Sequence, residues 1–221
     1  MYPMTRSRTM ILCITALMLA ACGSSTSSGP SLSPAAAISP IPSAATGPTP
    51  APTISTVGWQ TYKMPTAGSI LHPPLWGPIT PTMFYGNLSS KQITDLGWVI
   101  VFLNTDPQQA DATSSITIAK VPKNSTPLRE WAVSNIGSMY PSTFQVLGIS
   151  ETTLAGFPAI EIRGTMPTDD AAKGPPYFLI DTIETSDSRY VFYGMALTNK
   201  YAALILPVIR AIYNSFVPSV R

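Results

Sequence analysis

The stretch over residues 23–56 restricts folding to the rest of the chain. It consists almost wholly of Ser, Thr, Ala, Pro and Gly, and no charged residue occurs between Arg8 and Lys63. Because its prolines recur and large apolar side chains are scarce, it cannot bury enough surface to offset the entropy of ordering. We therefore expect residues 22–56 to form a disordered tether and residues 57–221 to form one globular domain.

The first 21 residues are typical of a bacterial export signal. Arg6 and Arg8 precede an apolar run, Met10–Ala20, which is shorter than the roughly 20 apolar residues that span a bilayer. The run ends in Leu19-Ala20-Ala21-Cys22, which resembles a lipobox. An ordinary secretory signal in which the cysteine is incidental, or an uncleaved anchor, are the alternatives.

A lipobox predicts cleavage between Ala21 and Cys22 and acylation of the Cys22 thiol, with chains such as palmitate. We expect an extracytoplasmic protein that is anchored by lipid to the bacterial cell membrane. Cleavage would remove Cys13, so no disulfide or cysteine metal site could form. It would also remove two of the 13 basic residues and leave 11 against 11 acidic ones. Such a neutral chain lacks the basic surface that nucleic-acid binding requires.

Apolar runs and alternation predict about eight strands within residues 57–221. The run Trp98–Leu103 is apolar throughout, which is typical of a central strand covered on both faces, whereas Ser115–Lys120 alternates and should have one covered face. Thr185–Ser188 should form a hairpin turn, with Glu184 and Arg189 paired across it. The expected strands are 59–62, 69–72, 98–103, 115–120, 144–149, 159–165, 177–184 and 190–197.

Two helices are expected beside these strands. Thr126 is a candidate N-cap with Pro127 at the first helical position, and apolar residues then follow at helical spacing to Ile136. A second apolar stripe runs from Asn199 to Asn214, where Pro207 should kink or divide the helix. Strands flanked by widely separated helices indicate an α+β fold with an antiparallel sheet.

Residues 57–217 resemble, over nearly all of their length, the PsbP-like fold family, that is, the extrinsic photosystem II subunit, its bacterial relatives and small exported lipoproteins. Four short motifs carry the resemblance. The motifs are Trp59-Gln60-Thr61-Tyr62, Ile70-Leu71-His72-Pro73-Pro74-Leu75-Trp76, the turn Leu154-Ala155-Gly156-Phe157-Pro158-Ala159 with Ile160-Glu161-Ile162, and Asn214-Ser215-Phe216. The resemblance implies a central antiparallel sheet sandwiched by helices. It also implies that the relatives are adaptor or binding proteins and not enzymes. Gly77–Asp95 fits this pattern poorly and is expected to be an insertion or a lid-like loop.

Nothing in the sequence indicates a catalytic, metal or cofactor site. His72 is the only histidine, and no Gly-x-Ser-x-Gly motif is present. A zinc site would need several His or Cys ligands, so we interpret His72 as structural. Asp169-Asp170 could offer oxygen ligands to calcium, but without further ligands at suitable spacing a solvated loop tip is the better interpretation.

Asp181 and an aromatic stretch are the candidate binding residues. Asp181 alternates with Leu179 and Ile183, so it should face their apolar side, either paired with an arginine or hydroxyl of a neighbouring strand or at the floor of a ligand pocket. Trp76, Phe84 and Tyr85 lie in a proline-rich stretch and could form an exposed recognition surface, although aromatic residues are more often core. Glu161 and Arg163 should be solvated.

Two function classes are favoured by these features. The first is a tethered, non-catalytic interaction or adaptor module that docks on an envelope protein. The second is a lipoprotein whose sheet–helix crevice binds a small apolar molecule in a closed pocket. An exported hydrolase is a third, and would require Asp181 beside His72 and a serine.

Overall fold

The structure, a computed structural model, describes residues 54–106, 114–168, 174–196 and 199–219. The predicted signal, Cys22, nearly all of the predicted tether and Asp169-Asp170 lie outside these ranges. Among the helices of the described ranges, none has the length and apolar character needed to cross a membrane.

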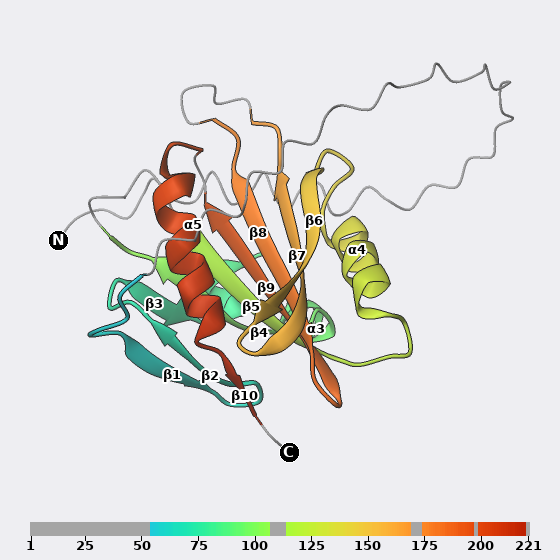
Figure 1. The fold of residues 1–221 in the computed structure, drawn as a ribbon, viewed down its shortest axis with the longest axis horizontal. Coiled ribbons are helices and arrows are strands. Elements are labelled where there is room, and N and C mark those ends of the chain that lie inside the picture. Colours follow the sequence, from blue (N-terminus) through green and yellow to red (C-terminus); the bar gives the residue numbers. More distant parts are fainter. Residues whose placement is uncertain (1–53, 107–113, 169–173, 197–198, 220–221) are drawn as a thin grey trace, which may run out of the picture. The chain divides into compact units, whose positions relative to one another are not determined.

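A seven-stranded antiparallel sheet runs through the domain in the order β3-β4-β5-β9-β8-β7-β6 (Figure 1). Its central strands are buried on both faces, as expected for a sheet between two layers. The α+β class with a central antiparallel sheet is therefore confirmed. The strands are β3 (Trp76–Ile79), β4 (Trp98–Asn104), β5 (Ser114–Pro122), β6 (Gln145–Leu154), β7 (Phe157–Thr165), β8 (Tyr177–Glu184) and β9 (Ser188–Ala196).

Each face of this sheet is covered by a long helix (Figure 1). Helix α5 (Asn199–Asn214) packs on the face that carries Ile116 and Phe192, and helix α4 (Leu128–Met139) packs on the opposite face. A smaller sheet lies on the α5 side, in the order β1-β2-β10. Its strands are β1 (Gln60–Met64), β2 (Gly68–His72) and β10 (Val217–Pro218). The sheet is thus sandwiched by helices, as the resemblance implied.

The Gly77–Asp95 segment is ordered and is not a lid-like loop. It contains β3 and two short helices, α2 (Pro81–Phe84) and α3 (Ser90–Asp95). A reciprocal capping box between Ser89 and Gln92 begins α3. The sequence did not predict β3, because four residues that include a proline lack the alternation of a longer strand.

Two strand expectations need correction. Strand β4 is buried on both faces at its middle, as predicted, but it is the second strand from the sheet edge and not central. Strand β5 is buried on both faces from Ser114 to Ala119, although one solvated face was expected. Its alternate polar residues Ser115 and Thr117 lie beneath the layer on the α4 side, where Thr117 bonds to Tyr85.

The two helix predictions are also refined by the structure. Helix α4 begins at Leu128 with Pro127, not Thr126, at the N-cap position, and no side chain caps it. The carbonyl of Thr126 instead accepts a hydrogen bond from Arg189. Helix α5 is continuous through Pro207 and is not divided there.

Both expected turns between the later strands are present. The amide of Thr185 donates to the Ser188 carbonyl at 2.9 Å, and the expected cross-strand pair forms, with Arg189 Nε 2.8 Å from Glu184 Oε2. Between β6 and β7, Ala155 and Gly156 have φ values of 51° and 83°. Positive φ at both central residues is typical of the tight turn that matches strand twist.

Candidate functional site

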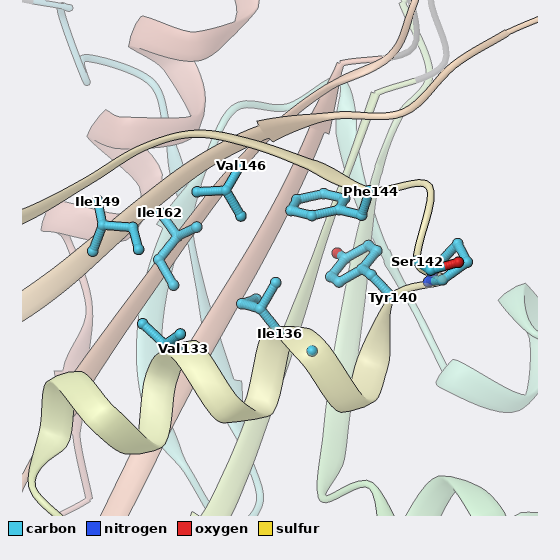
Figure 2. Close-up of a pocket in the computed structure, with 10 residues that line it drawn as sticks. Val133, Ile136, Tyr140, Ser142, Phe144, Val146, Ile149 and Ile162 are labelled. Carbon is cyan, nitrogen blue, oxygen red and sulfur yellow. The ribbon is translucent and has the colours of Figure 1, made fainter. Parts of the chain in front are cut away.

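An apolar groove lies between helix α4 and the adjoining edge of the large sheet (Figure 2). Val133 and Ile136 rise from the helix and face Val146 and Ile149 of β6, with Ile162 of β7 behind them. We call this feature the α4–β6 groove. Its volume is about 280 Å³, and it is open to solvent along one side. It is therefore a surface site and not an enclosed cavity.

Aromatic stacking closes one end of the α4–β6 groove. Tyr140 and Phe144 follow α4, and their ring centroids lie 4.5 Å apart in a stacked arrangement. Both rings also make edge contacts with Phe178 of β8, at 5.3 and 5.5 Å. Gly164 of β7 makes room for this arrangement, because a Cβ atom there would overlap the Phe144 ring. The end of the groove is thus a closely packed aromatic wall.

The rim of the α4–β6 groove is exposed and hydrophobic. Val133 and Val146, which line the groove, are 43% and 49% exposed, and Leu147, which follows Val146 in the chain, is 57% exposed. None of the residues that line the groove is charged. Adjacent exposed apolar side chains around an uncharged hollow are typical of a surface that docks another molecule.

Arg189 fixes the position of α4 relative to the sheet. This side chain is fully buried, and it bonds to Glu184, to Asn124 Oδ1 at 2.6 Å and to the Thr126 carbonyl. Its guanidinium also lies 5.0 Å from the ring centroid of Trp131 on α4. Because the planar guanidinium offers donors in fixed directions, it joins the β8–β9 hairpin to the loop before α4.

Two buried tyrosine hydroxyls lie on the same sheet face, and their chemistry is inert. Tyr193 accepts a hydrogen bond of 2.7 Å from Asn135, and the Tyr85 hydroxyl lies 2.9 Å from that of Thr117. Burial raises the pKa of Tyr85 and of Tyr193 to about 12, although these hydrogen bonds oppose the shift. Both phenols therefore stay protonated at neutral pH and offer no general base.

The predicted aromatic recognition surface does not form. Trp76 is only 3% exposed and belongs to the core on the α5 side, so the expectation that it is exposed was wrong. Phe84 is half-buried against Tyr85, and Tyr85 packs 4.2 Å from Trp98, between ring centroids, on the α4 side. Trp76 of the edge strand β3 and Tyr85, which follows α2, therefore lie on opposite faces of the sheet.

Asp181 faces the α5 side, as its alternation predicted, but lacks the expected partner. It is fully buried, and neither carboxylate oxygen has a hydrogen-bond partner among the described residues. Burial raises the pKa of Asp181 from its ordinary value of 3.8 to about 7. The α4–β6 groove lies on the opposite face, so Asp181 is not its floor.

Glu161 is buried and not solvated, because α5 covers it. It is 6% exposed, and the Arg210 guanidinium of α5 pairs with its carboxylate. Arg163 contributes a second contact of 3.3 Å from the half-exposed side. Only the arginine of the predicted solvated pair thus meets water.

His72 has a structural environment, in agreement with its interpretation from sequence. It is buried, its Nδ1 lies 3.0 Å from the Pro73 carbonyl, and its ring packs on Phe102. Since neither oxygen of Asp181 is hydrogen-bonded within the described residues, the Asp–His pair that a hydrolase would need is not formed there. The same residues contain no group of three or more His, Cys, Asp or Glu that could hold a metal ion.

The groove residues were not singled out from the sequence. Val133 and Gly137 lie off the predicted apolar stripe of α4, and Val146-Leu147 is a consecutive apolar pair at the start of β6. Apolar residues that fall outside the period of their own element are the signal that could have identified the groove.

Comparison with solved structures shows the fold. The cyanobacterial PsbP (CyanoP) from Synechocystis sp. PCC 6803 superposes with a TM-score of 0.50 and 13% identity, and the match covers 77% of this chain and all of that protein. This domain therefore has the PsbP-like fold.

Two further solved structures are similar at a TM-score of 0.45. LpqN, involved in cell envelope biogenesis of Mycobacterium tuberculosis, is 13% identical over 68% of this chain and 82% of its own. PA94 of Pseudomonas aeruginosa, of unknown function, is 12% identical over 74% of this chain and 99% of its own. No protein-family model matches the sequence, and no curated protein matches it.

Proposed function

We propose that this chain is an extracytoplasmic lipoprotein whose domain is a non-catalytic adaptor that docks an envelope protein in the α4–β6 groove. The observation that carries the proposal is the groove itself, which is uncharged, lined mainly by apolar side chains and bordered by the exposed Val133 and Val146. The export signal, the lipobox and the long uncharged stretch that follows support a tethered position outside the cytoplasm.

A closed apolar pocket for a small molecule is the alternative, and the shape of the groove argues against it. Small-molecule sites typically enclose about 300–1,000 Å³ and bury most of the ligand surface. The α4–β6 groove has about 280 Å³ and is open along one side. An open groove can instead accept side chains that a protein partner inserts from the solvent-exposed side.

Site-specific crosslinking in intact native cells tests the docking role. A photo-crosslinking amino acid in place of Val133 should give a reproducible crosslink to one protein, and the same amino acid in place of Lys91 on α3 should not. Gly137→Leu should abolish this crosslink, because Gly137 lines the groove and a Cβ atom added there would have nothing within 4 Å. Ser138→Leu is the matched control, since it adds the same side chain one residue outside the lining.

A crosslink that survives Gly137→Leu, or repeated recovery of no crosslinked protein, would contradict docking in the groove. An apolar molecule retained in native mass spectrometry and displaced by Gly137→Leu would favour the pocket alternative. The anchor has its own test: a fatty-acid probe should label the wild-type chain, and labelling that persists in Cys22→Ala would refute lipidation at this cysteine.

A further inference from the structure

The two edges of the seven-stranded sheet differ in how they are protected. The β3 edge has only four residues, includes Pro78 and leads directly into α2. Short length and proline are common ways to prevent an edge from pairing with another chain. The β6 edge has ten residues, contains neither proline nor lysine and has one charged residue, Glu151. Apart from a register shift between Val146 and Gly148, β6 lacks such protection, so of the two edges it is the better suited to accept another strand.

The outer side of β6 has backbone hydrogen-bonding groups that no strand of the described ranges pairs with. Strand β6 is last in the sheet order, and within the described residues its ladder runs to β7 alone. Successive residues of a strand direct their N–H and C=O groups alternately to the two sides, so about half of these groups face outward. The ladder to β7 shifts register between Val146 and Gly148, so the regular row of outward groups runs from Gly148 to Leu154. Such a row is a template for an added strand.

The side chains beside this edge select an uncharged segment. The α4–β6 groove has no charged lining residue. The one charge of β6, Glu151, faces the Arg129 guanidinium of α4 at 3.7 Å. A charged side chain placed over the groove would lose hydration without finding a partner.

We propose that the docked partner is an extended, uncharged segment of another protein that adds to β6 as an eighth strand. This inference rests on the proposed docking function and specifies how the partner binds. An added strand lies about 4.8 Å beyond β6, and every second side chain projects to the α4 face. Apolar residues at alternate positions of the segment enter the groove beside Val146 and Ile149.

A second copy of this chain fits the edge less well than a different protein. In a β6–β6 pair, the side chains offered to each groove would come from the other β6. Among the α4-facing side chains of β6, Val146 and Ile149 already line their own groove, and Glu151 pairs with Arg129 of α4. They cannot also fill the groove of a partner copy, so the groove needs a strand from elsewhere.

A designed peptide tests strand addition on the full-length chain. The probe is acetylated and amidated Lys-Thr-Val-Thr-Val-Thr-Val-Thr-Lys, and the control peptide carries N-methyl groups on the seven residues between the lysines. The probe should bind saturably and slow hydrogen exchange of outward β6 amides at least tenfold, and the control should do neither. No β6 protection at millimolar probe, or equal binding of the two peptides, would overturn the proposal.

A pair of neighbouring proline variants separates strand addition from docking as such. In Glu151→Pro and Thr152→Pro, one variant loses a hydrogen bond to β7 and the other loses only an outward N–H group. The variant that loses only an outward N–H group is identified by a melting temperature closer to that of the wild type. This variant should bind the probe at least tenfold more weakly than the wild type and should lose the crosslink from position 133. If both variants unfold, the N-methylated control still decides the outcome.

The failure of each proposal has its own signature. A position-133 crosslink that Gly137→Leu removes but the folded proline variant retains would leave docking intact and overturn strand addition. A position-133 crosslink that persists both in Gly137→Leu and in the folded proline variant would overturn both proposals. A crosslink that joins only two copies of this chain would overturn the inference that the added strand comes from another protein.

Discussion

Glu161 of β7 and Asp181 of β8 lie directly opposite each other in the strand register beneath helix α5. Both carboxylates are buried, but only Glu161 has cationic partners, in Arg210 and Arg163. Asp181 has no hydrogen-bond partner within the described residues, and Phe192 is its register neighbour on the other side. The negative charge of Glu161 is therefore neutralised by arginines, whereas burial disfavours the charged form of Asp181.

Because Asp181 is buried without a partner in the described part of the chain, its pKa is higher in the folded domain than in the unfolded chain. The free energy of unfolding should therefore fall as pH rises from the unfolded-state pKa to the folded-state pKa. In the unfolded chain Asp181 ionises near its ordinary pKa of 3.8, whereas in the folded domain its pKa is about 7. Between these values the folded state binds more protons, so rising pH favours unfolding by up to about 1.4 kcal/mol per unit. The summed loss is on the order of 4 kcal/mol.

Asp181→Asn should remove that contribution, because the amide stays neutral at every pH. Denaturant unfolding of both proteins at pH 5 and pH 8 measures it. Asp181→Asn should be more stable than the wild type at pH 8, with much less difference at pH 5. Glu161 is present in both proteins, so the comparison isolates the effect of the substitution at position 181. Parallel pH profiles for the two proteins would show that Asp181 ionises normally.

The Asp181 environment illustrates what the sequence could and could not predict. Alternation with Leu179 and Ile183 gave the correct face, because side-chain direction in a strand follows from the period of two. The absence of a partner depends on which residues α5 and the neighbouring strands bring to that face, and this is a tertiary property. For the same reason Glu161 was expected to be solvated although α5 covers it.

Gly164 and Phe144 provide a test of the aromatic wall. Gly164→Ala should destabilise the domain by about 1–3 kcal/mol, because its Cβ atom would force the Phe144 ring off its site. Phe144→Leu in the same chain should relieve part of that cost. A double-mutant cycle from thermal or denaturant unfolding measures the coupling. Additive effects of the two substitutions would contradict the close contact.

Arg189 should be far more important for stability than an exposed cation beside it. Arg189→Met removes the bonds to Glu184, Asn124 and Thr126 and should cost about 3 kcal/mol or more. Arg189→Lys should recover little, since an ammonium cannot reproduce the planar arrangement of donors. Lys123→Met is the control: Lys123 pairs with Glu184 at 2.6 Å but is 38% exposed, so its loss should cost no more than about 1 kcal/mol.

The fold was more predictable than the site. Most strands, both long helices and the Glu184–Arg189 pair follow from local patterns, because periodicity and turn chemistry are read within one element. Strand β3 was missed because it is too short for a pattern. The α4–β6 groove arises from the position of α4 over the β6 edge, which no single element encodes, and Trp76 and Tyr85 were separated by the path of the chain around the sheet.

Gly137 and Gly156 provide a matched pair for the backbone around the groove. A Cβ atom added at either position has nothing within 4 Å, so added contacts do not distinguish them. Gly137 lies within helix α4, whereas Gly156 has a φ of 83° in the β6–β7 turn. Gly137→Ala should therefore raise the free energy of unfolding by about 0.5–1 kcal/mol. Gly156→Ala should lower it by about 1 kcal/mol, because a left-handed backbone is strained for alanine. Denaturant unfolding of the two variants measures both values.

A loss of stability in Gly137→Ala would mean that the space beside α4 is already filled. It would also remove the basis for using Gly137→Leu to block the groove.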